Sequence, residues 1–215
     1  MDKIEFRQKC KKKLQKVKNN YIRDVKVNQN LQTLLKALKP KSILFYYPFA
    51  FEADIRKTIK ALRRQGVEIY LPLMRDVSFK VVKYRLPLCK NRFGIVEPKD
   101  SYYRFAAIEV AVIPIIGVDR NFKRVGFGKG MYDRYFDNKN SSITKIFVQR
   151  SLCISSFELC QDHDVRADFL ITPSLRLKIR RDGHGIRVDS SSNCFSTIRR
   201  RSRISYIKKA SICEL

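Results

Sequence analysis

Residues 108–136 read IEVAVIPIIGVDRNFKRVGFGKGMYDRYF and carry the pattern that decides the fold class. The stretch 108–116 is the most apolar strand candidate in the chain. A loop of turn residues and glycines follows, and helical spacing returns from about Lys129 to Phe136. A buried strand, a glycine loop and a helix in succession are typical of an α/β fold.

Helical and strand patterns alternate on both sides of this unit. Apolar residues recur every three or four positions from Phe6 to Tyr21 and predict a first helix. After a polar stretch near 24–30 we expect helices over 31–38 and 52–65, and strands over 42–47, 67–73, 79–86, 144–149 and 168–172, the last two being the final strands. The pattern predicts an α/β three-layer sandwich with a mostly parallel or mixed central sheet.

The charge of the chain indicates an anionic partner. The 215 residues carry 46 Lys and Arg against 20 Asp and Glu, a formal net charge of +26. Nucleic acid, a membrane surface and a phosphate-bearing small molecule would each suit that balance. Residues 176–215 hold 11 of the basic residues and 3 of the acidic ones. We expect residues 1–175 to form one domain and residues 176–215 to form a basic tail of low order. The tail explains only part of the net positive charge of the chain.

Targeting signals and metal-binding cysteines are not indicated. The first residues lack the apolar core of a signal peptide, and no stretch approaches the length of a membrane span. The six cysteines form no CxxC pair and the chain has two histidines, which excludes the usual zinc spacings. We therefore expect a cytoplasmic protein with reduced cysteines and no membrane partner.

The glycine loop suits a phosphate group. Gly126, Gly128 and Gly130 alternate, and such glycines permit positive φ and close approach of backbone amides to a ligand. Arg124 and Lys129 bracket them with positive charge. The spacing matches neither GxxxxGK[ST] nor GxGxxG, so a P-loop or dinucleotide site is not predicted. A tight glycine turn with two solvated cations explains the residues equally well.

Two separated carboxylates could hold a metal beside the loop. Asp133 follows the glycines and Asp164 precedes the last expected strand. One or two carboxylates with phosphate oxygens and waters are sufficient for Mg²⁺. Asp133 could instead form an i,i+4 pair with Lys129 on one helix.

Four separated motifs are similar to those of the 5-formyltetrahydrofolate cyclo-ligase family. They are VIPIIGVD (112–119) with FKRVGFGKGMYDR (122–134), KIEFR (3–7), FGIVEP (93–98) and HD (163–164). The resemblance covers residues 3–173. It implies ATP-dependent, Mg²⁺-assisted conversion of 5-formyltetrahydrofolate to 5,10-methenyltetrahydrofolate in one-carbon folate metabolism.

The resemblance also implies the site residues. ATP would be bound by Lys3, Ile4, Glu5, Phe6 and Arg7 and by Arg124, Val125, Gly126, Phe127, Gly128, Lys129, Gly130, Met131 and Tyr132, of which Arg124 and Lys129 would be catalytic. Tyr47, Glu52 and residues 127–131 would line the folate pocket, and Asp133 and Asp164 would hold Mg²⁺. Phe6 stands where the family usually has Leu, and Met131 replaces a common aromatic residue. For Glu52, a first-turn helix acid is the competing interpretation.

The implied partners are ATP and 5-formyltetrahydrofolate, polyglutamylated or not, for a monomer without an obligate nucleic acid. Lys3, Arg7 and Lys11 form a second stripe on the first helix, so their cations line one ridge. We expect this ridge, the glycine loop and both Asp residues to meet at the carboxyl end of the sheet. The alternative is a nucleic-acid-binding protein, suggested by basic runs such as 11–13 and 199–201.

Overall fold

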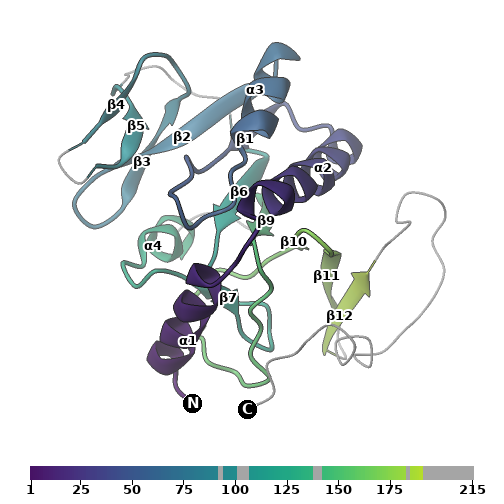
Figure 1. Cartoon of the computed structure of the whole chain (residues 1–215). Helices are drawn as coiled ribbons and strands as arrows, with labels where there is room; N and C mark the ends of the chain where they lie inside the picture. Colours follow the sequence, from purple (N-terminus) through teal and green to yellow (C-terminus); the bar gives the residue numbers. More distant parts are fainter. Residues whose placement is uncertain (92–93, 101–106, 138–141, 183–184, 191–215) are drawn as a thin grey trace.

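An eight-stranded mixed sheet forms the centre of the computed structural model, which describes residues 1–91, 94–100, 107–137, 142–182 and 185–190 (Figure 1). In spatial order its strands are β12 (Gly185–Ser190), β11 (Arg176–Asp182), β10 (Phe169–Ile171), β9 (Thr144–Val148), β6 (Val110–Pro114), β1 (Ser42–Leu44), β2 (Glu68–Met74) and β3 (Phe79–Lys83). The run from β10 to β2 is parallel, whereas β3 and β11 pair antiparallel with their neighbours. The predicted mixed α/β sheet is confirmed.

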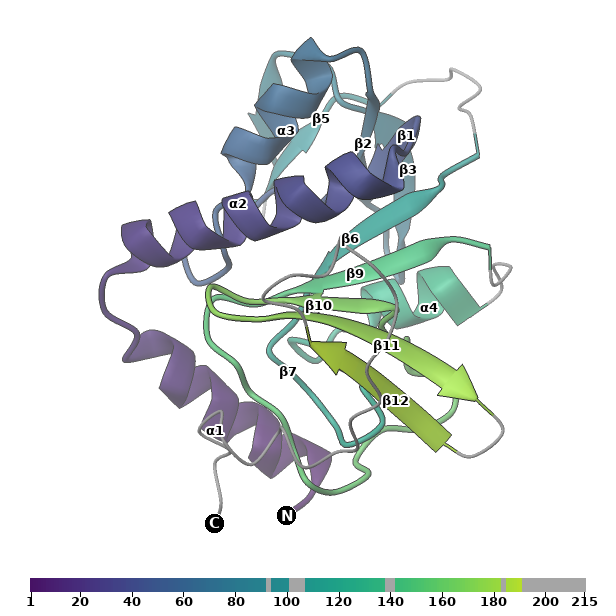
Figure 2. The same cartoon turned by 90° about the vertical axis from the view of Figure 1, so that its right-hand side faces the viewer.

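Helices cover both faces of the sheet. The helices α2 (Asn20–Leu38) and α3 (Arg56–Arg64) contact each other on one face, and α4 (Met131–Asp137) lies on the other (Figure 2). The connection from β1 to β2 moves across the sheet in the direction opposite to that from β6 to β9. Right-handed crossovers therefore place α3 and α4 on opposite faces, which gives the predicted three layers.

The main hydrophobic core forms because helices cover both faces of the sheet. All five residues of β6 are buried, as expected for a strand with helices on both sides. A second, smaller cluster lies under α1 (Lys3–Gln15), where Phe6, Cys10 and Leu14 pack with the loops that follow β6 and β9. Helix α1 is thus fixed at the carboxyl end of the parallel strands. No helix in the described ranges has both the length and the apolar character needed to cross a membrane.

The first two helices differ from the prediction. The stripe expected to run to Tyr21 belongs to two helices, because α1 ends at Gln15 and Asn19 turns the chain with φ of 57°. Helix α2 also includes the polar stretch 24–30, whereas the sequence pattern predicts a helix only over 31–38. The buried Asn28 is satisfied there: its Nδ2 donates to the carbonyl oxygen of Asp54 (2.6 Å) and its Oδ1 accepts from the Thr58 amide (3.0 Å).

The interpretation of residues 176–215 as a tail of low order is wrong for 176–182 and 185–190. Strand β11 pairs antiparallel with β10, so residues 168–172 are not the last strand, and β12 pairs with β11. Leu177 and Ile179 are buried between more exposed basic residues, which is the period-two pattern of a strand with one covered face. Residues 191–215, which include the 199–201 basic run, lie outside the described residues.

Two small ribbons complete the fold, and neither was predicted. One joins β4 (Leu88–Lys90) to β5 (Val96–Pro98), and the other joins β7 (Gly117–Val118) to β8 (Arg124–Val125). The second ribbon leads directly into the glycine loop. It therefore sets the position from which the loop leaves the sheet.

Candidate active site

Helix α1 and the glycine loop meet at the carboxyl end of the parallel strands. Arg7 donates from Nε to the carbonyl oxygen of Gly126 (2.8 Å), and Lys3 Nζ lies 2.5 Å from Asp164 Oδ2. Lys11 completes the ridge with its Nζ 6.0 Å from the ring centroid of Phe127. The expected meeting of the ridge with the loop is confirmed.

Backbone geometry in the loop requires glycine. A Cβ on Gly126 would overlap the guanidinium of Arg124, so any other residue there would force this buried side chain to move. Gly128 has φ of 114°, which L side chains rarely adopt. A Cβ at Gly128 would be 3.9 Å from Arg7 Nη1, so Arg7 flanks the exposed tip of the loop.

Arg124 is buried behind the loop. Its Nε donates to the carbonyl oxygen of Pro114 (3.2 Å), its Nη1 pairs with Asp133 Oδ2 (3.0 Å), and its guanidinium lies 5.0 Å from the Tyr132 ring centroid. The interpretation of Arg124 as a solvated cation is therefore wrong. Lys129, by contrast, has an exposed side chain.

Asp133 is held on both carboxylate oxygens. Oδ2 accepts from Arg124, and Oδ1 accepts from the backbone amide of Val165 at 3.3 Å. Helix α4 begins at Met131, not at Lys129, so a pair of Asp133 with Lys129 along one helix does not apply. The side chain of Asp133 is buried.

The backbone connects the second carboxylate, that of Asp164, to Asp133 through the neighbouring residue Val165. Asp164 Oδ2 accepts from Lys3 and from the amide of Gln161 (2.8 Å), and the next residue, Val165, bonds Asp133. In the part of the chain that the structure describes, no three His, Cys, Asp or Glu residues gather as a metal cage. Two hard oxygen donors fit Mg²⁺ that shares its remaining ligands with phosphates and water.

The expected folate side adjoins the loop. Glu52 is buried, and its Oε2 accepts from the amide of Phe49 at 2.9 Å. Burial raises the pKa of Glu52 from its usual 4.5 to about 7, although the Phe49 amide, Arg124 and Arg150 oppose the rise. Glu52 precedes α3 by four residues, so the first-turn helix interpretation is wrong. Tyr47 is half-buried and interacts with Arg56 at the start of α3.

The remaining predicted residues differ in exposure. Phe6 lies in the small core under α1, and the side chains of Ile4 and Glu5 are exposed. Of residues 3–7, Arg7 therefore reaches the glycine loop and Lys3 reaches Asp164. Val125, Gly126 and Tyr132 are buried, whereas Phe127, Gly130 and Met131 are half-buried.

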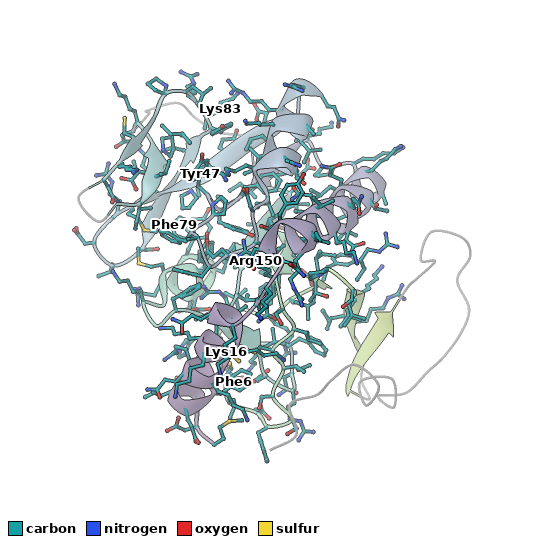
Figure 3. The ribbon with its side chains drawn as sticks, viewed as in Figure 1. Phe6, Lys16, Tyr47, Phe79, Lys83 and Arg150 are labelled. Atoms are coloured by element: carbon teal, nitrogen blue, oxygen red, sulfur yellow. The ribbon has the colours of Figure 1, made fainter. Side chains whose placement is uncertain are left out.

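Two residues that build the site were missed. Asp119 is buried and accepts four backbone amides: Asn121 and Lys123 on Oδ1, and Leu159 and Cys160 on Oδ2. Its position at the end of an apolar strand was the available signal. Arg150 pairs with Asp24, 126 residues away, and donates to the carbonyl oxygen of Ala50 (3.0 Å). In the view of Figure 3 it lies between Tyr47 and Phe6. No local pattern indicated it.

The fold and the site together define an α/β protein with a cation-lined glycine loop beside two buried carboxylates. The chain belongs to the 5-formyltetrahydrofolate cyclo-ligase family, whose family model matches residues 1–173. Among named relatives, the 5-formyltetrahydrofolate cyclo-ligase of Haemophilus influenzae is 27% identical over 120 residues, 52% of this chain and 64% of that enzyme. The Mycoplasma pneumoniae enzyme of the same name is 26% identical over 150 residues, 69% of this chain and 83% of its own.

Solved structures are similar over a larger share of the chain. The 5,10-methenyltetrahydrofolate synthetase of Aquifex aeolicus matches with a TM-score of 0.70 and 26% identity, covering 85% of this chain and 95% of that one. The synthetase of Mycoplasma pneumoniae matches with a TM-score of 0.66 and 23% identity, covering 81% and 100%. The second likeness supports the fold alone.

Proposed function

We propose that the protein is a 5-formyltetrahydrofolate cyclo-ligase, which uses ATP to convert 5-formyltetrahydrofolate to 5,10-methenyltetrahydrofolate and releases ADP and phosphate. Family membership supports this proposal, and ATP is the co-substrate of the family. The observation that carries it is the contact of the Lys3–Arg7 ridge with the glycine loop, directly beside Asp133 and Asp164.

The proposed chemistry needs no nucleophile from the protein. The γ-phosphoryl group moves to the formyl oxygen, N10 of the folate attacks the activated carbon, and phosphate leaves. Phosphoryl transfer depends mainly on positioning and charge neutralisation. Arg7 is suited to this work because Gly126 holds its Nε, so the terminal nitrogens can face phosphate oxygens. Lys129 adds an exposed cation at the loop tip, and Arg124 supplies positive charge from the buried side.

Asp133 and Asp164 would hold Mg²⁺, which neutralises phosphate charge when it is bound. Each carboxylate already has a cationic partner, Arg124 and Lys3 respectively. Lys3 is the more exposed of the two cations, so it can leave Asp164 and turn toward a phosphate. Arg124 is fixed on several sides and would keep Asp133 oriented.

Glu52 and Tyr47 would receive the pterin end of the folate. A buried carboxyl with a pKa of about 7 can donate or accept a proton near neutral pH. Glu52 can therefore pair with the polar edge of a pterin ring in either protonation state.

The same proposal includes a cytoplasmic monomer that binds no obligate nucleic acid and accepts polyglutamylated folate. The high positive charge suits polyglutamate chains. Cys10, Cys89, Cys153 and Cys160, the cysteines that the structure describes, are reduced thiols, which suits a reducing compartment.

The test is a coupled measurement of both products. Purified protein with MgATP and 5-formyltetrahydrofolate should develop the absorbance of methenyltetrahydrofolate and release equimolar ADP. ATP hydrolysis that responds to RNA or DNA, without any methenyl product from folate, would overturn the proposal.

A further inference from the structure

Three phenylalanine rings line up at the surface beside the site. The rings of Phe49 and Phe51 stack with centroids 5.6 Å apart and planes at 20°, and Phe51 lies 4.8 Å from the ring of Phe127. Phe49 is 38% exposed and Phe51 is 43% exposed, although both are large and apolar. A contiguous exposed aromatic surface of this kind marks a binding surface more often than a solitary exposed ring does.

Hydrogen bonds from buried side chains fix the backbone that carries Phe49 and Phe51. Arg150, itself buried, donates to the carbonyl oxygen of Ala50, which lies between the two phenylalanines. The two carboxylate oxygens of Asp24 fix that guanidinium, because each accepts a hydrogen bond of 2.9 Å from it, Oδ1 from Nε and Oδ2 from Nη2. Glu52 closes the turn by accepting from the Phe49 amide, and its own amide donates to the Phe49 carbonyl oxygen at 3.0 Å. The rings are therefore preorganised in the positions they occupy.

Charge is arranged asymmetrically along this surface. The buried carboxyl of Glu52 accepts from the backbone amide of Phe49 at one end, and Lys11 of α1 lies at the other, with its Nζ 6.0 Å from the centroid of Phe127. A ligand that fits both ends would carry a polar heterocycle, then an aromatic ring, then an anion. A reduced folate has this order in its pterin, p-aminobenzoyl ring and glutamate.

We propose that Phe49, Phe51 and Phe127 form a stacking platform for the p-aminobenzoyl ring of the folate, and that Lys11 pairs with the adjoining glutamate carboxylate. This inference rests on the proposed function and adds to it the residues that select the tail of the substrate. Offset stacking of a ring on Phe51 would supply affinity, and the cation of Lys11 would favour a carboxylate over the neutral adenine ring of ATP.

The experiment compares ligand binding in Phe51→Ala, Phe51→Leu and Lys11→Gln with the wild type. Titration calorimetry without ATP measures the Kd of 5-formyltetrahydrofolate and of 5-formyltetrahydropteroate, which lacks the glutamate. Phe51→Ala should weaken both folates about tenfold, and Phe51→Leu, which keeps an apolar cover but no ring, should weaken them less. Lys11→Gln should weaken 5-formyltetrahydrofolate about threefold and leave the pteroate unchanged.

Phe157→Ala is the matched control. Phe157 lies in the loop after β9 and is 54% exposed. Its carbonyl oxygen accepts from the Arg120 amide, and its own amide donates to the Ser155 hydroxyl oxygen. It should leave both Kd values and the KM for ATP unchanged. Wild-type affinity in both Phe51 variants, or a rise only in the KM for ATP, would overturn the platform, and the second result would assign the surface to adenine. Methenyl product from the wild type is a separate readout, so failure of the platform and failure of the proposed function are distinguishable.

Discussion

The Nε of Arg7 donates a hydrogen bond of 2.8 Å to the carbonyl oxygen of Gly126, 119 residues further along the chain. This bond joins the second turn of α1 to the loop that follows β8. Phe6, the preceding residue, fixes α1 because its ring lies close to Gly117 in the small core that also holds Cys153. The ridge and the glycine loop therefore form one rigid surface.

Arg7→Ala should raise the KM for ATP at least tenfold and leave the KM for 5-formyltetrahydrofolate nearly unchanged. The variant loses a charge-assisted hydrogen bond to the loop and the guanidinium proposed to face phosphate, and such bonds contribute about 1.5–3 kcal/mol each. Steady-state kinetics with each substrate varied in turn checks the prediction. Gln8→Ala, at the adjacent exposed position of α1, is the control and should behave as wild type. Equal rises for both substrates would argue for a general loss of structure.

Asp164→Asn should fold normally and lose most activity, with partial recovery at higher Mg²⁺. Its partner Lys3 can reach solvent, so removal of the charge leaves no buried cation without a partner. Asp133→Asn should differ, because it leaves the buried Arg124 without its carboxylate and costs about 3–5 kcal/mol of folding stability as well. Activity measured against Mg²⁺ concentration, with urea unfolding of each variant, separates the two effects.

Asp76→Asn serves as the control for these variants, since its side chain is exposed and lies between β2 and β3, outside the proposed metal site. Near wild-type turnover of Asp164→Asn at low Mg²⁺ would contradict the metal assignment.

Glu52→Gln should make the protein more stable above pH 7 and no more stable at pH 4.5. Burial raises the pKa of Glu52 from 4.5 to about 7, so the folded protein binds this proton more tightly than the unfolded chain. The wild type therefore has the full contribution below pH 4.5 and loses it as the pH rises through 7. The difference amounts to about 3 kcal/mol at most. Urea unfolding of both proteins between pH 4.5 and 8.5 measures it, and parallel curves would show that Glu52 has an ordinary pKa.

Removal of residues 176–215 should destabilise the protein, whereas removal of residues 191–215 should leave folding and activity within a few fold of wild type. The longer deletion takes away β11, uncovers β10, and exposes the partners of Leu177 and Ile179. Burial of two such side chains contributes about 3–6 kcal/mol. Thermal unfolding of the two truncated proteins tests this. Equal stability would show that β11 adds nothing to the sheet, and would support a catalytic domain that ends at 175.

Local patterns predicted much of the fold because strand and helix periodicities are properties of neighbouring residues. The apolar run 108–116, the glycine loop and the cationic stripe on the first helix were visible without any tertiary information. The same patterns failed where charge masked the periodicity. In the strand β11 the two buried side chains alternate with basic residues, so its composition resembles that of a tail.

The sequence by itself determined the α/β class, the place of the glycine loop after a buried strand, and the set of cations near it. Tertiary structure alone decided which of those charges are buried. Arg124 could be interpreted as a solvated cation and is enclosed against Asp133. Arg150 had no local signal, yet it bonds the Ala50 carbonyl between Phe49 and Phe51 while Asp24 fixes its guanidinium. A charge can be buried only where distant parts of the chain supply its partners. Such partners are set by how the helices pack on the sheet, which local periodicity does not specify.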